Sequence, residues 1–160
     1  MPKIIKENKI IIDDWQLARE ESDVNSGKII VALPLWLAHK ESLQSRQGEI
    51  GLLLTSSDEP ESIKDDLHHF KLIAVEFPMF SDGRGYTIAR LLRERYHFTG
   101  EIRAVGDVLQ DQLFYMKRCG FDAFAIREDK DIQAALKSLN DFSDSYQAGV
   151  DQPLPLFRRR

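Results

Sequence analysis

The residues best suited to chemistry lie in the segment 81–86, where Gly83 and Gly85 flank Arg84 just before a helix-like stretch. Two glycines permit unusual backbone angles and expose amide N–H groups. The guanidinium of Arg84 is suited to clamping a small anion, and Asp82 to capping the helix or acting on a ligand. A tight turn held by an Asp82–Arg84 contact is an equally good interpretation. The segment matches neither the nucleotide P-loop nor the dinucleotide-binding fingerprint.

Two further arginines follow apolar runs of strand length. Arg103 lies inside such a run, where an unpaired charge is costly, so we predict an ion pair, with Glu76 as the favoured partner. Arg127 follows the next run, and Asp107 is interpreted as the cap of a following helix. Convergence of Arg84, Arg103 and Arg127 at one edge of a sheet would create an anion site.

Other motifs point to no specific catalytic centre. Cys119 is the single cysteine, and its apolar neighbours predict a buried hydrophobe rather than a nucleophile. The four histidines do not have metal-ligand spacing, and Gly-x-Ser-x-Gly is absent. The sequence therefore gives no metal ligand, no evident cofactor and no assignable catalytic residue.

The elements that must position these residues follow from hydrophobic patterning. Two β-branched runs, 3–6 and 9–12, predict a small hairpin. Apolar runs of strand length then alternate with amphipathic stretches of helical period. The predicted strands are Ile29–Leu33, Ile50–Leu54, Leu72–Phe77, Ile102–Val105 and Ala123–Ile126, and the predicted helices include Tyr86–Tyr96, Gln110–Cys119 and Asp131–Phe142.

Repeated βα units predict an α/β protein with a parallel sheet and right-handed crossovers. An open three-layer, flavodoxin-like arrangement is the first choice, and a partial (β/α) barrel is the alternative, since a full barrel needs about 250 residues. We expect a single domain over residues 1–160. It comprises an N-terminal hairpin and loop (1–27), a βα core (28–142) and a C-terminal tail (143–160) that has lost the helical period.

Composition narrows the class of protein. The 22 basic and 26 acidic residues give a formal charge of 22 − 26 = −4, which disfavours a general nucleic-acid binder. The balance of 42 % hydrophobic and 30 % charged residues is typical of a globular protein and excludes a membrane span. Nothing at the N-terminus resembles a signal peptide, so we expect a cytoplasmic protein.

Three long strings carry a family resemblance. They resemble the bacterial domain of unknown function 934 family, and the similarity extends from about residue 31 to the helix near Phe142. The strings are Glu76-Phe77-Pro78-Met79-Phe80-Ser81-Asp82-Gly83-Arg84-Gly85-Tyr86, Gly100-Glu101-Ile102-Arg103-Ala104-Val105-Gly106-Asp107-Val108-Leu109 and Met116-Lys117-Arg118-Cys119-Gly120-Phe121-Asp122-Ala123-Phe124.

The family is encoded beside assimilatory sulfite reductase, so the resemblance implies a role in converting sulfite to sulfide for cysteine supply. We expect an accessory protein that acts with the sulfite reductase haem enzyme or its electron donor. The alternative is a small enzyme or sensor that binds an anionic metabolite at the Asp82/Arg84 loop. The family is labelled an oxidoreductase, but the sequence of this chain contains no cofactor-binding motif that supports the label. The exposed apolar ends are compatible with a homodimer.

Overall fold

The computed structural model describes residues 2–24, 26–78, 83–127 and 129–143, and it begins with a hairpin. Strand β1 (Lys3–Lys6) pairs antiparallel with β2 (Lys9–Ile12), as predicted. The two turn residues, Glu7 and Asn8, have φ values of 53° and 62°. A two-residue turn with positive φ at both positions matches the right-handed twist of the flanking strands, which explains the tight hairpin.

Six parallel strands follow in strictly sequential order. The whole sheet is ordered β2-β1-β8-β7-β6-β5-β4-β3, and β1 pairs antiparallel with β8. The parallel strands are β3 (Gln16–Ala18), β4 (Ile29–Ala32), β5 (Ile50–Leu54), β6 (Leu72–Phe77), β7 (Glu101–Gly106) and β8 (Ala123–Phe124).

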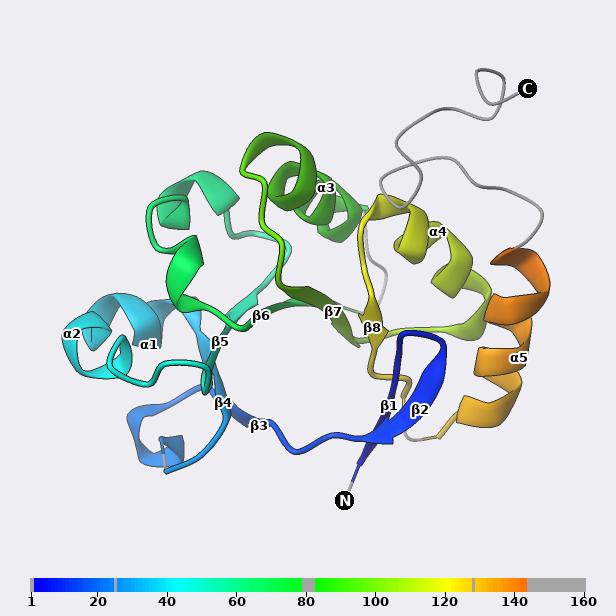
Figure 1. Ribbon diagram of the computed structural model, residues 1–160, viewed down its shortest axis with the longest axis horizontal. Coiled ribbons are helices and arrows are strands. Elements are labelled where there is room, and N and C mark those ends of the chain that lie inside the picture. Colours follow the sequence, from blue (N-terminus) through cyan, green and yellow to red (C-terminus); the bar gives the residue numbers. More distant parts are fainter. Residues whose placement is uncertain (1, 25, 79–82, 128, 144–160) are drawn as a thin grey trace.

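The helices surround the outside of this sheet, which curls into a half-barrel (Figure 1). They are α1 (Leu33–Ala38), α2 (Lys40–Leu43), α3 (Arg84–Arg90), α4 (Leu113–Cys119) and α5 (Ile132–Ser143). A π-helical turn, η4 (Leu91–Arg95), extends α3, and 3₁₀ turns are formed by η1 (Glu21–Asp23), η2 (Pro60–Ile63), η3 (Leu67–His69) and η5 (Gln110–Gln112). No helix in the described ranges has the length and apolar character needed to cross a membrane.

The expected flavodoxin-like arrangement is wrong, and the partial barrel is consistent with the structure. A doubly wound sheet reverses its strand order and carries helices on both faces. Here β3 to β8 run in one direction around the curve, and each crossover returns over the same outer face (Figure 1). The antiparallel hairpin at one end also makes the sheet mixed rather than purely parallel.

Two apolar clusters show how the curved sheet is filled. The larger lies between the outer face of the strands and the helices, and includes Trp36, Phe77 and Leu113. The smaller contains inward-facing strand residues, with Trp15 and Ala125 packed against it: Ile30, Leu53, Leu72, Ala74 and Val105. Both faces of the sheet therefore bury apolar side chains, which is why several strands are nearly continuous apolar runs.

Several element boundaries differ from prediction by a few residues. Leu33 begins α1 rather than ending β4, and Pro34 occupies its first turn, where the missing N–H costs nothing. Strand β7 is longer and β8 shorter than predicted, and β3 was not predicted. Residues 144–160, the expected tail, lie outside the described residues.

Candidate functional site

A cavity of about 720 Å³ lies at the carboxyl ends of β7 and β8, and we call it the carboxyl-end cavity. In (β/α) barrels this end carries the ligand sites, because the loops that follow the strands converge there. Among the described residues, three cations and one carboxylate line it, together with apolar side chains. The lining comprises Pro2, Lys3, Ile4, Asp13, Gly106, Ala125, Ile126, Arg127, Lys130 and Ile132.

Arg127 is fixed at this cavity by two carboxylates. Its Nη1 donates to Asp107 Oδ1 at 2.8 Å, while Nε and Nη2 donate to the two oxygens of Asp129 at 3.1 and 2.9 Å. The carboxylates of Asp107 and Asp129 raise the pKa of Arg127, so the guanidinium stays charged. Predicted site residues Asp107 and Arg127 are therefore brought together, from the end of β7 and the loop after β8.

Asp107 is not the helix cap that the sequence indicates. The next helical turn, η5, begins at Gln110, and no side chain caps it. Instead the Asp107 N–H donates to the Phe77 carbonyl at 2.7 Å, which joins the ends of β6 and β7. Gly106 has a φ of 89°, and a Cβ there would lie 2.5 Å from the Phe77 carbonyl oxygen. Only glycine permits this close approach, which aims Asp107 at Arg127.

Two lysines complete the positive wall of the carboxyl-end cavity. Lys3 begins β1, and the antiparallel register of β1 with β8 carries it toward the residues that follow β8. Lys130 follows Arg127 in a turn closed by the Lys130 N–H to Arg127 C=O bond at 3.0 Å. Within the described part of the chain, neither ammonium group lies within ion-pair distance of a carboxylate. These two charges are available to an anion.

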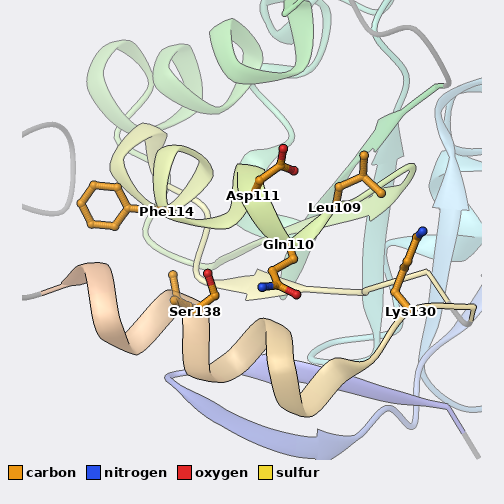
Figure 2. Close-up of a pocket in the computed structure, with 7 residues that line it drawn as sticks. Leu109, Gln110, Asp111, Phe114, Lys130 and Ser138 are labelled. Atoms are coloured by element: carbon orange, nitrogen blue, oxygen red, sulfur yellow. The ribbon is translucent and has the colours of Figure 1, made fainter.

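Lys130 also lines a second cavity of about 520 Å³ between η5, α4 and α5 (Figure 2). Phe114 lies near its other end, and Gln110, Asp111 and Ser138 lie between them (Figure 2). Lys130 therefore stands where the two cavities meet. This second cavity is mostly apolar and has one cation, so it is less suited to a small anion than the carboxyl-end cavity.

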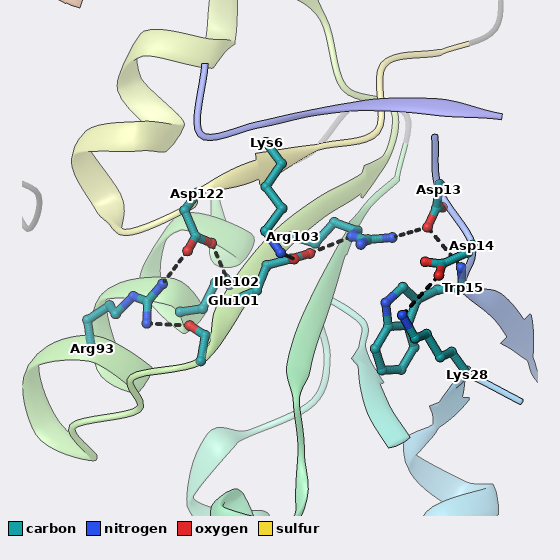
Figure 3. Close-up of polar contacts among 11 residues, drawn as sticks. Lys6, Asp13, Asp14, Trp15, Lys28, Arg93, Glu101, Ile102, Arg103 and Asp122 are labelled. Atoms are coloured by element: carbon teal, nitrogen blue, oxygen red, sulfur yellow. Dashed lines mark hydrogen bonds and ion pairs between the residues drawn. The ribbon is translucent and has the colours of Figure 1, made fainter. Parts of the chain in front are cut away.

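Arg103 lies inside the half-barrel, in a chain of ion pairs (Figure 3). Its Nη1 donates to Asp13 Oδ1 at 2.8 Å and its Nε to Glu101 Oε2 at 2.7 Å, and Lys6 reaches Glu101 Oε1 at 2.8 Å. The Arg103 side chain is only 3 % exposed. The hydrogen bond to Glu101 is the main cause that raises the pKa of Lys6. The predicted ion pair exists.

Its predicted partner is wrong. Glu76 accepts hydrogen bonds from Arg19 instead, at the mouth of the half-barrel. Glu76 pairs in register with Val105, two residues beyond Arg103, which leaves it too far along the strand. Asp13, in the connection between β2 and β3, takes the place that the sequence assigns to Glu76. No local pattern indicates a contact between residues 13 and 103.

The three arginines line three different cavities. Arg84 borders one of about 500 Å³ between α3, η4 and residues 56–61, outside the barrel. Arg103 borders the interior cavity near the amino ends of the strands, and Arg127 the carboxyl-end cavity. The cavities of Arg103 and Arg127 are neighbours, because Ile4 and Asp13 line both of them. Arg84 is not part of this arrangement.

The glycine-flanked loop is only partly described, because Asp82 lies outside the described residues. Gly83 precedes α3 with a φ of 90°, and Arg84 is exposed in the first turn. A Cβ on Gly85 would lie 2.5 Å from Phe77 Cε1, so glycine at this position lets α3 pack on the end of β6. Gly85 therefore has a packing role.

The model of one protein family matches two thirds of the chain. It covers residues 51–157, from β5 onward, and therefore includes Arg84, Arg103, Asp107, Arg127 and Lys130. Lys3 and Asp13 lie outside the matched range. No curated protein matches the chain, and neither does any solved structure. The chain belongs to the family described as bacterial protein of unknown function, DUF934.

Proposed function

We propose that the protein is an accessory protein of assimilatory sulfite reduction, which acts with the sulfite reductase haem enzyme or its electron donor. In this role the carboxyl-end cavity binds a small oxyanion such as sulfite. The process is implied by the resemblance of the sequence to its family. One observation supports an anion as the ligand: Lys3 and Lys130 line the same cavity, beside the fixed Arg127.

Charge distinguishes the carboxyl-end cavity from the cavity that Arg84 borders. Among the described residues of the carboxyl-end cavity, Asp13 is paired with Arg103 and Arg127 with Asp107 and Asp129, so the charges left over are the ammonium groups of Lys3 and Lys130. The described lining of the Arg84 cavity has two cations, Arg84 and Arg95, against three carboxylates. Those carboxylates are Asp58, Glu59 and Glu61. An anion is therefore attracted more strongly to the carboxyl-end cavity, because the carboxylates of the Arg84 cavity repel it.

The test is thermal stabilisation of the purified chain by sulfite, with sulfate and chloride at equal ionic strength as comparisons. Ligand that binds only the folded state raises the melting temperature with its concentration. We expect Lys3→Ala and Lys130→Ala each to reduce the sulfite effect and the double variant to abolish it. Lys64→Ala is the matched control, because Lys64 is an exposed lysine far from the cavity with one weak contact to Glu61. Equal responses of the double variant and Lys64→Ala would remove the cavity from the proposal.

The role in the cell is tested separately, by growth of a deletion strain on different sulfur sources. Growth on sulfide but not on sulfate or sulfite, restored by the wild-type gene, is the expected result. Normal growth on all three would refute the role in sulfite reduction while leaving anion binding to be judged by the thermal assay.

The second candidate is a small enzyme or sensor that binds an anionic metabolite at the Asp82/Arg84 loop. The observation in its favour is that Arg84, Thr87 and Arg95 lie on one side of the α3–η4 helix and border the same cavity as Ser56 and Ser57. Hydroxyl and guanidinium donors are common ligands of oxyanions. Loss of anion stabilisation in Arg84→Ala, with no loss in the double lysine variant, would favour this candidate.

A further inference from the structure

Strand β2 ends the sheet, and its outer edge pairs with no other strand in the described residues. It is the last strand in the sheet order, and β1 is its one neighbour among the described strands (Figure 1). Within β2, Ile11 is 38 % exposed and Ile12 is 59 % exposed. Natural edge strands are normally protected by proline, a bulge, charges or a covering helix or loop, because an open edge templates pairing with another chain. Helix α5 packs beside β2, but no backbone hydrogen bond joins the two elements in the described residues. The β1–β2 register is uninterrupted and β2 contains no proline.

The hairpin register fixes which backbone groups point outward. The Asp13 N–H donates to the Pro2 carbonyl. Because the hydrogen-bonding direction alternates along a strand, the backbone N–H and C=O groups of residues 9, 11 and 13 point toward β1. The N–H and C=O groups of Ile10 and Ile12 therefore point away from β1, to the free edge. No hydrogen bond joins them to any other described residue.

This edge is complementary to itself. In an antiparallel pair centred on Ile11, Ile10 of one chain faces Ile12 of the other, and each such pair exchanges two backbone hydrogen bonds. Ile11 then faces its own copy in the closer, non-hydrogen-bonded position. Lys9 faces Asp13, whose Oδ1 is held by Arg103, so each Lys9 adds a second cation beside the carboxylate on the same side of the sheet as the Ile11 contact.

Registers shifted by one residue lose these features. Centring on Ile10 places Ile12 beside turn residue Asn8, and centring on Ile12 places the apolar Ile10 beside the charged Asp14. Only the register centred on Ile11 covers both exposed isoleucines and sets Lys9 against an acid. We propose that β2 is the interface of a two-fold symmetric dimer, in which the half-barrel sheets of two copies of this chain join edge to edge through Ile10–Ile12.

Cross-linking tests the register. In Ile11→Cys the two cysteines occupy a non-hydrogen-bonded cross-strand pair, whose short Cα separation suits a disulfide. The native Cys119 is buried and does not compete. We expect the oxidised variant to run as a covalent dimer under non-reducing conditions. Leu37→Cys is the matched control, because Leu37 is 55 % exposed on α1, away from the edge. This variant should run as a monomer on the same gel.

Solution mass tests the interface independently. The wild-type chain, 18.4 kDa, should show a concentration-dependent mass that approaches twice this value in light scattering. Ile12→Pro deletes one outward N–H per chain, and so two hydrogen bonds per dimer, which should weaken the dimer at least about tenfold. Circular dichroism and the melting curve show whether that variant is folded. Lys9→Glu, which sets like charges opposite each other, should weaken the dimer without touching the backbone.

Two results would overturn the proposal. One is a wild-type chain that stays at the monomer mass at every concentration, with Ile11→Cys no more cross-linked than Leu37→Cys. The other is a dimer whose stability is unchanged in Ile12→Pro and Lys9→Glu and which does not cross-link through residue 11, since that dimer must use another surface.

Discussion

The Arg103 guanidinium lies 2.8 Å from the Asp13 carboxylate, although 90 residues separate them in sequence. Arg103 is in the middle of β7, and Asp13 is in the connection that links β2 to β3, at the two ends of the sheet. This ion pair therefore ties the centre of the half-barrel to the segment that joins its edges. Because Asp13 also lines the carboxyl-end cavity, the same contact holds one wall of that cavity in place.

We expect Arg103→Met to lower the free energy of unfolding by about 3 kcal/mol, because it leaves the half-buried Asp13 without its ion-pair partner and the buried Glu101 with Lys6 alone. Urea denaturation monitored by tryptophan fluorescence measures the loss. The matched control is Lys28→Met, which breaks the pair with Asp14, the neighbour of Asp13. Both of those side chains are about half exposed, so the control should lose less than about 1 kcal/mol. Similar losses in the two variants would show that Arg103 does not hold the interior together.

Gly106 provides a test of how the cavity is built. Gly106→Ala should lower the free energy of unfolding by about 3 kcal/mol or more, because its Cβ would collide with the Phe77 carbonyl as well as adopt a left-handed backbone. Gly48→Ala is the control, since Gly48 has a φ of 77° with open space around it. The free energy of unfolding of Gly48→Ala should fall only by the cost of the left-handed backbone, about 1–2 kcal/mol. A loss in Gly106→Ala no greater than in Gly48→Ala would mean that β6 and β7 separate easily at this end.

Cys119 should be chemically inert in the folded protein. It is fully buried at the end of α4, as its apolar neighbours predict, and burial raises the pKa of its thiol despite the nearby Arg90 and Tyr115. We expect a thiol-specific reagent to modify it only at the rate of unfolding, since the thiolate is the reactive form. Leu37→Cys supplies an exposed thiol for comparison and should react at once. Rapid labelling of the wild-type chain would show local opening of α4.

Sequence patterning predicts the strands well and their curvature poorly. Leu72 and Ala74 face inward while Ile73 and Val75 face the helices, so both sides of β6 are apolar. The same run would suit a flat sheet with helices on both faces, and nothing within it distinguishes the two arrangements. The sequence does not predict β3, because three residues are too short to show the apolar pattern of a strand. Its pairing depends on β4.

The candidate site was predictable only where its residues follow strands. Asp107 comes directly after β7 and Arg127 lies in the loop that follows β8, and adjacent parallel strands end at the same edge. Lys3 belongs to a hairpin whose place in the sheet is set by long-range antiparallel pairing with β8. Asp13 reaches the interior for the same reason. Local sequence contains no signal for either, because the contacts depend on how the sheet closes.

Asp66 should make the stability of the fold depend on pH. It is buried, accepts hydrogen bonds from Trp36 Nε1 at 3.0 Å and pairs with Lys40 at 2.8 Å. Burial alone would raise the pKa of Asp66, but the contacts with Lys40 and Trp36 together outweigh burial and lower it below the ordinary value of 3.8. A depressed pKa means that the ionised carboxylate stabilises the fold above pH 3.8. That contribution is lost as the pH falls through the folded-state pKa.

We therefore expect Asp66→Asn to be destabilised by about 1–3 kcal/mol at pH 7, the range for hydrogen bonds to a charged group. The difference from wild type should narrow as the pH drops below 3.8, because the wild-type carboxylate then becomes protonated as well. Urea unfolding at a series of pH values measures both quantities. Asp65→Asn changes the exposed neighbour and should match wild type throughout. A deficit in Asp66→Asn that stays constant down to pH 2 would show that Asp66 acts through its shape and not its charge.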